Sequence, residues 1–401
     1  MRVFVLLALV GMLTISPRAW GWNDASRMAT IQSIVERGTL AIDGTDFHTM
    51  DKVSIGGQFF SDKPATPQLA GAMVYAPLRA AGIELHTGWS LAYYLITLLT
   101  VKLLWWLSLI AFYKALGYTG LTQSRRLLLT TALGVGTLAL TWSATFNSHS
   151  WAASWVTIGL LFLLRARTGT RPTASAFGGG LAFGLAGGAD IATLALPVAF
   201  GCSLAFDRWL RRRLWAYATG LALALAPWLV TNYAISGGLV PVQLVARYFL
   251  FPGSPWTPEQ LTGAQMNSGA ALAGYSFSLL FGGRGFLLYN PLALLAIPLL
   301  LREFSKRRRF AVEALATTGA SMLIFGYYAL WSNNFSGASY SIRWFVPLLP
   351  LWIFFCTRCY AGAGGSRWRS FSQSSRSRLR LPMSARGTHG PGSNTGRFRC
   401  L

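Results

Sequence analysis

The stretch that decides the fold is residues 22–77, WNDASRMATIQSIVERGTLAIDGTDFHTMDKVSIGGQFFSDKPATPQLAGAMVYAP. This polar stretch lies between two long apolar segments of the chain. The 401 residues include only 12 Asp and Glu. Several of these acids fall here, namely Asp24, Asp43, Asp46, Asp51 and Asp62, together with Arg27 and Lys63. The chain therefore concentrates its carboxylates beside its first apolar segment.

The composition outside this stretch is that of a membrane protein. Hydrophobic residues make up 53% of the chain and charged residues only 12%, which excludes an ordinary soluble domain. A helix needs about 20 apolar residues to cross a bilayer. The apolar runs predict an all-α polytopic membrane protein with about ten transmembrane helices. We place them at approximately 2–17, 89–113, 126–146, 150–164, 173–188, 190–206, 214–232, 285–301, 310–331 and 343–357.

Basic residues fall in every second connection between these segments, which predicts the orientation. The clusters are Arg2, Lys114 with Arg125 and Arg126, Arg165 to Arg171, Arg208 to Arg213, and Arg302 to Arg309. Because short basic loops stay in the cytoplasm, the alternate connections should share the far side. Those are 18–88, 147–150, the turn at 187–188, 233–284 and 332–342. The formal charge of +23 then reflects topology and contact with anionic lipid, so we expect no nucleic-acid partner.

The two ends of the chain need separate interpretation. We favour an uncleaved first helix, which would hold Asp24 at the membrane surface; signal cleavage near Gly21 is the alternative. Residues 1–357 form the predicted transmembrane domain. Residues 358–401 lack Asp, Glu, Lys, Ile and Val, and a chain of this basic, low-complexity composition cannot bury a core. A shifted reading frame would produce such a tail, and a natural cytoplasmic tail is the alternative. The cysteine pair at 356 and 359 has no second ligand pair, so we expect no metal there.

Within the insert, apolar residues at Met28, Ile31, Ile34 and Val35 have helical spacing. They predict a helix from Asn23 that lies along the membrane surface and ends at Gly38. A loop over 49–64 follows, and residues 67–85 return to the bilayer. Carboxylates held beside Lys63 can accept a proton from a hydroxyl, or bind a divalent cation that neutralises phosphate.

These residues resemble a known family. The segments 23–27, 36–43 and 49–51, and above all GQFFSDKP at 57–64, are similar to the first periplasmic loop of bacterial GT-C glycosyltransferases of the protein-mannosyltransferase and aminoarabinose-transferase type (family 39). The likeness continues at 147–149, 227–232, 282–287 and 337–345, and covers about residues 20–350. The chain departs from the family pattern where Ala65 replaces a second proline and Phe60 a tyrosine, and where it ends early.

The resemblance implies a GT-C-like membrane enzyme of the bacterial inner membrane, with its active site facing the periplasm. Such an enzyme takes a sugar from a polyprenyl-phosphate carrier and transfers it to a glycan, lipid or protein acceptor. On this basis Asp24 is the candidate base, with Asp51 and Asp62 as rivals. Phosphate would be held by Lys63, Arg284 and Arg343, and His149 would contact the sugar or acceptor. No cofactor is implied with certainty, and a divalent cation remains compatible.

Each of these residues also has a simpler interpretation. Asp24 could be the N-cap of the surface helix, Arg343 an interfacial anchor, and His149 a solvated loop residue. Lys102, within a predicted span, should face a polar interior and receives no catalytic role. The alternative functions are a transporter or flippase of lipid-linked sugars, and an inactive truncated transferase. Transporters place charge along a path through the helices, whereas most acids here lie in one loop, which favours the enzyme.

Overall fold

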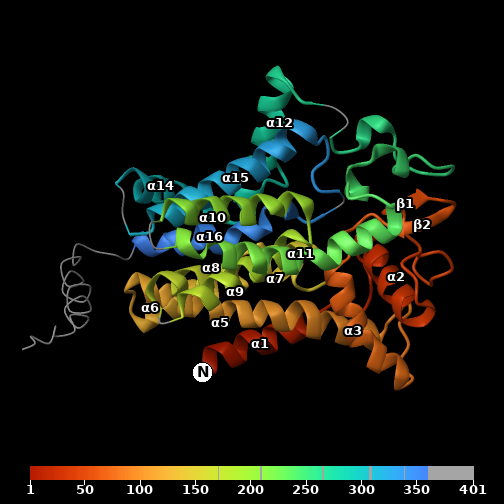
Figure 1. Ribbon diagram of the computed structural model, residues 1–401, viewed down its shortest axis with the longest axis horizontal. Coiled ribbons are helices and arrows are strands. Elements are labelled where there is room, and N and C mark those ends of the chain that lie inside the picture. The colour runs from red at the N-terminus through yellow and green to blue at the C-terminus, as the bar shows by residue number, and fades with distance from the viewer. Residues whose placement is uncertain (170, 208–209, 264–265, 307–308, 338, 360–401) are drawn as a thin grey trace, which may run out of the picture. The chain divides into compact units, whose positions relative to one another are not determined.

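The computed structural model describes residues 1–359 apart from 170, 208–209, 264–265, 307–308 and 338. The predicted tail therefore lies outside the described residues from position 360 onward. The described part is mostly helical (Figure 1). Its helices are α1 (Arg2–Leu13), α2 (Trp22–Arg37), α3 (Thr66–Ala80), α4 (Leu91–Thr97), α5 (Leu103–Leu116), α6 (Gln123–Val135), α7 (Leu138–Trp142), α8 (Ser148–Thr168), α9 (Pro172–Gly187), α10 (Ala195–Phe206), α11 (Leu214–Ser236), α12 (Gly269–Phe281), α13 (Phe286–Tyr289), α14 (Pro291–Ser305), α15 (Ala311–Trp331) and α16 (Leu349–Phe355).

Three continuous helical stretches in the described residues are long and apolar enough to cross a membrane. They run over Leu91–Thr119, Arg211–Ser236 and Gly269–Tyr289. Shorter apolar helices cover Arg2–Leu13, Ile191–Phe206 and Arg343–Phe355. The first of the long stretches joins α4 to α5 through a π-helical turn at Leu98–Lys102. The apolar, helical character is thus as expected, while the number of ten spans stays a prediction.

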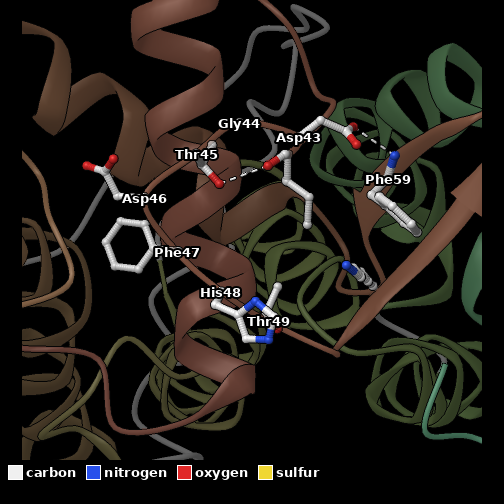
Figure 2. A pocket seen from close by; sticks show the side chains of 10 residues that line it. Asp43, Gly44, Thr45, Asp46, Phe47, His48, Thr49 and Phe59 are labelled. Carbon is white, nitrogen blue, oxygen red and sulfur yellow. Dashed lines mark hydrogen bonds between the residues drawn. The ribbon is translucent and has the colours of Figure 1, made fainter. Parts of the chain in front are cut away.

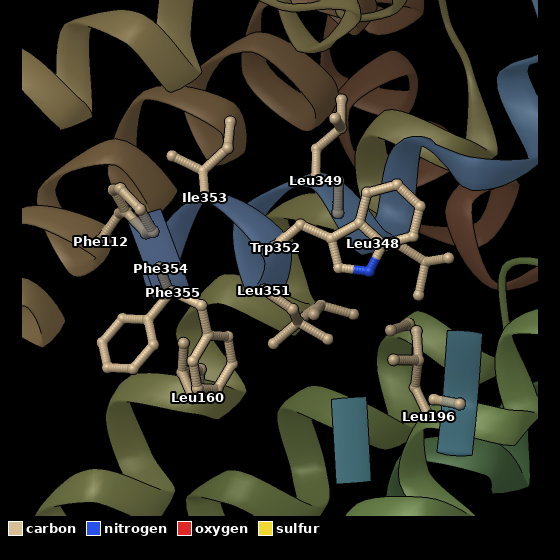
Figure 3. Packing of buried hydrophobic residues seen from close by; sticks show 14 of the residues in the cluster. Phe112, Leu160, Leu196, Leu348, Leu349, Leu351, Trp352, Ile353, Phe354 and Phe355 are labelled. Carbon is tan, nitrogen blue, oxygen red and sulfur yellow. The ribbon is translucent and has the colours of Figure 1, made fainter. Parts of the chain in front are cut away.

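The central core is built around α16, whose sequence LPLWIFF is apolar on every side. All seven of its residues are buried, as expected for a helix without a polar face. Figure 3 shows side chains of α5, α8 and α10 around it, among them Phe112, Leu160 and Leu196. The indole nitrogen of Trp352 donates a hydrogen bond of 2.9 Å to Ser321 Oγ on α15. This helix therefore ties together elements from both halves of the chain.

Helices α9 and α11 pack with their backbones in near contact because glycines line their interface. A Cβ atom on Gly180 would lie 1.9 Å from the carbonyl oxygen of Tyr217. A Cβ atom on Gly220 would lie 2.2 Å from the carbonyl oxygen of Phe177. Small residues permit such close approach of membrane helices. The glycines of α9 and α11 therefore serve the close packing of these two helices.

The polar insert contains a β-hairpin where the sequence analysis expected an irregular loop. Strand β1 (Lys52–Ile55) pairs antiparallel with β2 (Gln58–Ser61). Gly56 and Gly57 both have positive φ, 61° and 81°, as a two-residue hairpin turn of type I′ requires. The glycine pair was the signal in the sequence, so the loop prediction was wrong at this point. The predicted end of α2 is correct, since Gly38 adopts the left-handed conformation with φ 67°.

The connections gather at two ends of the helices, as the alternating basic clusters predicted. At one end, α2 and the hairpin meet the start of α8 and the segment 233–284 (Figure 1). At the other end, Arg167 in the last turn of α8 pairs with Asp207, which follows α10, and with Glu313 in the first turn of α15. Residues far apart in sequence are thereby brought to the end that holds the polar insert.

We expect the replacement Gly180→Ala to lower the thermal stability of the protein, because the added methyl group must displace the backbone at Tyr217. Overpacking of this kind costs about 1–3 kcal/mol. Gly319→Ala is the matched control in α15, since a Cβ atom there meets nothing within 4 Å. The control should be neutral or stabilising by up to about 1 kcal/mol. Thermal unfolding of the purified variants in detergent measures both, and equal melting temperatures would contradict the packing.

Candidate active site

Asp24 lies in the first turn of α2 and is almost fully buried, with 7% of its surface exposed. The N-cap of the helix is Gly21, so Asp24 is the third helical residue and the N-cap interpretation is wrong. One carboxylate oxygen accepts a long hydrogen bond of 3.5 Å from the backbone N–H of Trp20. Burial raises the pKa of Asp24 to about 6, although the nearby charges of Arg27 and Arg343 oppose the shift. The carboxylate is therefore poised to exchange a proton near neutral pH.

Arg27, one turn further along α2, is 2% exposed and joins the insert to the helical core. Its Nη1 atom donates to the carbonyl oxygen and the side-chain oxygen of Asn23. Its Nη2 atom donates a 2.8 Å hydrogen bond to Ser148 Oγ at the start of α8. Its Nε atom is buried without a hydrogen-bond partner. Part of this guanidinium group is therefore available to a ligand.

Lys63 lies between two carboxylates. Its Nζ atom is 3.0 Å from Asp51 Oδ2 and 2.6 Å from Asp62 Oδ2. Burial opposes the ionisation of Asp51, but the ammonium of Lys63 outweighs it and lowers the pKa of Asp51. For Asp62, burial and the negative charge of Asp51 prevail over Lys63 and raise the pKa. The three groups form one half-buried unit in which the lysine charge is already compensated.

Hydrogen bonds from α2 hold this unit in place. Ser26 Oγ donates to the carbonyl oxygen of Asp51 and lies 2.6 Å from Ser61 Oγ. Asn23 Nδ2 donates to Asp51 Oδ2 over 3.4 Å. The sequence analysis did not identify Ser26 or Ser61, and the only signal was that Ser26 shares a helix face with Asn23. These serines fix the hairpin ends against the turn that carries Asp24.

Arg343, at the beginning of the short helix Arg343–Leu348, reaches the same group of side chains. Its positive charge lowers the pKa of both Asp24 and Asp51. Its guanidinium lies 5.7 Å from the centre of the Trp142 ring, and its Nε atom is buried without a partner. Arg343 thus lies close enough to Asp24 and Asp51 for its charge to act on them, and its role as a phosphate ligand stays a prediction. Arg284, in contrast, is exposed and donates to the carbonyl oxygen of Gly337 over 3.1 Å, so its role as a phosphate ligand stays a prediction.

His149 is buried in the first turn of α8, with 6% of its surface exposed. The expectation of a solvated loop histidine is therefore wrong. Its Nδ1 atom lies 3.0 Å from Asp190 Oδ2. The other carboxylate oxygen of Asp190 accepts from the N–H of Ala192 over 3.1 Å. Sequence reasoning missed this partner, and its only signal was an acid in the turn between two apolar segments.

Further buried polar atoms without hydrogen-bond partners lie on the segments that carry Lys63 and His149. They belong to the segment after β2 and to the first turns of α3 and α8: Asp62 Oδ1, Thr66 Oγ1, Gln68 Oε1, Asn147 Nδ2 and Ser150 Oγ. The start of α3 also touches the end of α9, because a Cβ atom on Gly188 would lie 2.8 Å from Thr66 Oγ1. Buried polar groups in proteins nearly always have partners. This region therefore offers donors and acceptors to a polar ligand.

A separate hollow of about 280 Å³ lies beside the hairpin and is lined by residues 42–49, Lys52 and Phe59 (Figure 2). Its acids hold the loop together. Asp43 Oδ2 accepts from the N–H of Phe59 over 2.8 Å, and Asp46 Oδ2 accepts from Gln32 over 3.0 Å. Asp24, Asp51 and Asp62 do not line this hollow. We therefore assign the chemistry to Asp24, Asp51 and Asp62. Asp43 and Asp46, which line the hollow, have a structural role.

The donor set does not fit a divalent cation. Within the described ranges of the chain, no three His, Cys, Asp or Glu side chains are grouped as metal ligands require. The position between Asp51 and Asp62 is taken by the Lys63 ammonium. The positive charge of this site therefore comes from side chains of the protein.

No family model and no curated protein matches the sequence, but solved structures do. ArnT from Cupriavidus metallidurans in the apo state matches with a TM-score of 0.58 and 17% identity over 93% of this chain and 61% of that chain. ArnT bound to undecaprenyl phosphate matches with a TM-score of 0.57, again at 17% identity, over 93% and 62% of the two chains. The archaeal oligosaccharyltransferase AglB from Archaeoglobus fulgidus, in complex with an inhibitory peptide and a dolichol-phosphate, matches with a TM-score of 0.50 and 13% identity over 97% and 52%.

These similarities establish the fold. The chain has the GT-C architecture of ArnT and AglB, and the resemblance inferred from the sequence is confirmed at that level. The chain spans less than two thirds of the length of either protein. What those enzymes act on does not follow from the fold alone.

We expect Lys63→Met to destabilise the protein most strongly near neutral pH. The substitution leaves Asp51 and Asp62, which are partly buried, without their shared cation, so the loss should exceed the roughly 1 kcal/mol of an exposed ion pair. Lys63 lowers the pKa of Asp51 in the folded protein. The stabilisation from this pair is therefore fully present at pH values above the ordinary pKa of an aspartate. It is lost as the pH falls through the lowered pKa of the folded state.

Melting temperatures of wild type and variant between pH 7 and pH 3 test this expectation. The difference between the two proteins should shrink on acidification. Lys52→Met, in β1 of the same hairpin, is the control, because Lys52 lies over the Phe59 ring at 3.9 Å rather than between the two carboxylates. A pH-independent loss in Lys63→Met would contradict the charge assignment.

Proposed function

We propose that this protein is a membrane glycosyltransferase that moves a sugar from a polyprenyl-phosphate carrier to an acceptor hydroxyl on the periplasmic side of the bacterial inner membrane. The observation that carries the proposal is a buried carboxylate with a raised pKa, Asp24, beside two arginines that have unpartnered Nε atoms. The fold supports it, since the ArnT structure holds undecaprenyl phosphate and the AglB structure a dolichol-phosphate. The acceptor is a hydroxyl of a glycan, lipid or protein.

Asp24 would act as the general base. The acceptor oxygen attacks the anomeric carbon, its proton passes to the Asp24 carboxylate, and the bond from that carbon to the phosphate oxygen breaks. The leaving group departs as the polyprenyl phosphate. Asp51 is the weaker candidate because Lys63 lowers its pKa, which reduces its basicity. Asp62 has a raised pKa and remains the rival, although it shares Lys63 with Asp51.

Arg27 and Arg343 would stabilise the phosphate. Both lie close enough to Asp24 for their charges to lower its pKa, so all three border one small region. Guanidinium groups can bind phosphate oxygens through two parallel hydrogen bonds. Lys63, which the sequence suggested for this task, is already engaged by two carboxylates and would instead order the hairpin. Negative charge that develops on the departing phosphate thus meets fixed positive charge.

The unpartnered polar atoms near the starts of α3 and α8 suit the hydroxyl groups of a sugar. A hydroxyl can both donate and accept, and this region offers acceptors such as Gln68 Oε1 and donors such as Asn147 Nδ2. His149, fixed by Asp190 next to Ser148, lies at the same helix start. We assign these side chains to the sugar and not to the phosphate.

The transporter alternative receives less support from the structure. It requires polar groups along a path between the two membrane faces. The ammonium of Lys102, within the apolar stretch Leu91–Thr119, instead donates to Thr14 and Ser143 over 3.3 and 2.8 Å and is 3% exposed. Several of the buried polar atoms without a hydrogen-bond partner lie next to the insert, among them Arg27 Nε, Asp62 Oδ1 and Gln68 Oε1. This distribution favours transfer chemistry at a surface.

The replacement Asp24→Asn should abolish most transfer while it preserves the fold. Asn is nearly isosteric but cannot accept the acceptor proton, and loss of a general base lowers the rate roughly 10²–10⁴-fold. The measurement is transfer from a panel of polyprenyl-phosphate sugars to membrane acceptors by purified protein. Asp43→Asn is the control, since Asp43 is exposed and accepts a hydrogen bond from Phe59. Full activity in Asp24→Asn would move the base to Asp62, and absence of transfer by folded wild type with any donor would favour a transporter.

The raised pKa of Asp24 also predicts the pH dependence of transfer. The base must be ionised, so kcat/KM should be constant at neutral pH and fall tenfold per pH unit below about pH 6. Protonation of Asp24 does not itself destabilise the fold, because its folded pKa lies above its unfolded value and the neutral form is better tolerated when buried. Kinetics between pH 4 and pH 8, about two units on either side of this pKa, measure the fall of kcat/KM with acidification. An acidic limb near pH 4 would point to an unperturbed carboxylate instead.

A further inference from the structure

At the end of the molecule opposite the polar insert, three helices enclose a second hollow of about 360 Å³. It is lined by Lys114, Gly117, Tyr118, Arg126, Leu161 and Arg165. Lys114 is in the last turn of α5, Arg126 in the first turns of α6, and Arg165 in the last turn of α8. No acidic side chain lines this hollow. Three cations from three elements therefore face one space.

The charge in this hollow is not compensated in the way that charge nearby is. Arg167, two residues beyond Arg165, pairs with Asp207 over 3.0 Å and with Glu313 over 2.8 Å. Among the salt bridges of the described residues, none involves Lys114, Arg126 or Arg165. Like charges held close together repel one another, which is unfavourable unless an anion lies between them. The arrangement therefore points to a ligand of negative charge.

The hollow is shaped by the protein and is not merely a group of loose surface side chains. Arg126 Nε and Nη2 both donate to the carbonyl oxygen of Tyr113, over 3.2 and 3.0 Å, and its guanidinium lies 3.9 Å from the Tyr113 ring centre. A Cβ atom on Gly117 would approach the Arg126 guanidinium carbon to 3.4 Å, so the glycine leaves room beside it. Arg126 and Arg165 are half-buried, and Leu161 at the wall is buried.

The surroundings indicate the source of the anion. Lys114, Tyr113 and Tyr118 lie at the end of the apolar stretch Leu91–Thr119, where a membrane helix leaves the hydrocarbon. Tyrosines and basic residues at that depth meet lipid headgroups. Basic hollows between membrane helices on the side of the basic loops bind the phosphates of anionic lipids. We propose that this hollow binds the headgroup of an anionic phospholipid, with Lys114, Arg126 and Arg165 around the phosphate and Tyr118 at its rim.

The test measures lipid binding by the purified full chain in zwitterionic detergent, through the rise in melting temperature on addition of ligand. Phosphatidylglycerol should raise the melting temperature at low concentration. Phosphatidylcholine and inorganic phosphate, at matched phosphate concentration, should not. An equal rise with inorganic phosphate would overturn the assignment to a lipid, and an equal rise with phosphatidylcholine would overturn the need for a negative headgroup.

The variants locate the site. Each basic residue near a membrane contributes enough binding energy for about a fivefold change in affinity, so Lys114→Gln with Arg165→Gln should weaken phosphatidylglycerol binding about 25-fold. Arg171→Gln with Arg302→Gln removes two exposed charges near the same end that do not line the hollow, and should leave the affinity nearly unchanged. Equal losses in both pairs would show diffuse attraction to charge and overturn the site.

A charge-conserving pair separates binding from folding. Lys114→Arg with Arg165→Lys keeps both cations and should retain most of the affinity, even if the neutral pair lowers the stability without lipid. The single variants Lys114→Gln and Arg165→Gln provide the affinity if the neutral pair does not fold. Unchanged affinity in every folded variant would overturn the proposal.

Discussion

The hydrogen bond from Arg27 to Ser148 is the contact on which the candidate site depends. Arg27 is buried, and a buried cation is tolerated only when hydrogen bonds and opposite charge compensate it. Asn23 and Ser148 supply the hydrogen bonds, while Asp24, Asp51 and Asp62 supply the charge. This requirement forces the polar insert to lie against the start of α8. The same contact brings His149 and its partner Asp190 next to α2, although the two segments are separated by more than a hundred positions in sequence.

The electrostatic balance of this cluster matches the chemistry proposed for it. Three carboxylates, Asp24, Asp51 and Asp62, lie close to three cations, Arg27, Lys63 and Arg343. Lys63 compensates mainly Asp51 and Asp62. Because burial raises the pKa of Asp24 to about 6, this carboxylate becomes neutral in mild acid, and the two arginines then leave an excess of positive charge. A phosphate-bearing donor would restore the balance, and its arrival would favour the proton uptake that a base must perform.

The sequence predicted those features that depend on local pattern. Helix α2, its end at Gly38 and the acids of the insert follow from periodicity, glycine and composition, and the motif at 57–64 indicated the GT-C fold. The hairpin was missed although Gly56 and Gly57 marked its turn. The contact of Ser26 with Ser61 and the partner of His149 were also missed, whereas carboxylates beside Lys63 were expected. These are contacts between distant segments, and the periodicity of a single sequence predicts local structure but not which distant segments meet. Charge type identified the candidate residues, whereas burial and partners from other segments decide how each of them is engaged in the structure.

Lys102, the buried lysine in the apolar stretch Leu91–Thr119, also shows that the sequence predicted a residue's surroundings but not its partners. The sequence placed Lys102 within a span and suggested a polar interior, as a transporter would have. In the structure, its ammonium holds Thr14 at the end of α1 and Ser143 after α7. The next residues continue the chain of contacts: Ser16 N–H donates to the carbonyl oxygen of Ala144, Trp20 Nε1 donates to Ser16 Oγ, and the Trp20 N–H donates to Asp24. A cation that is costly in hydrocarbon thus anchors the segment that leads directly to the candidate base, and this explains its position without a path across the membrane.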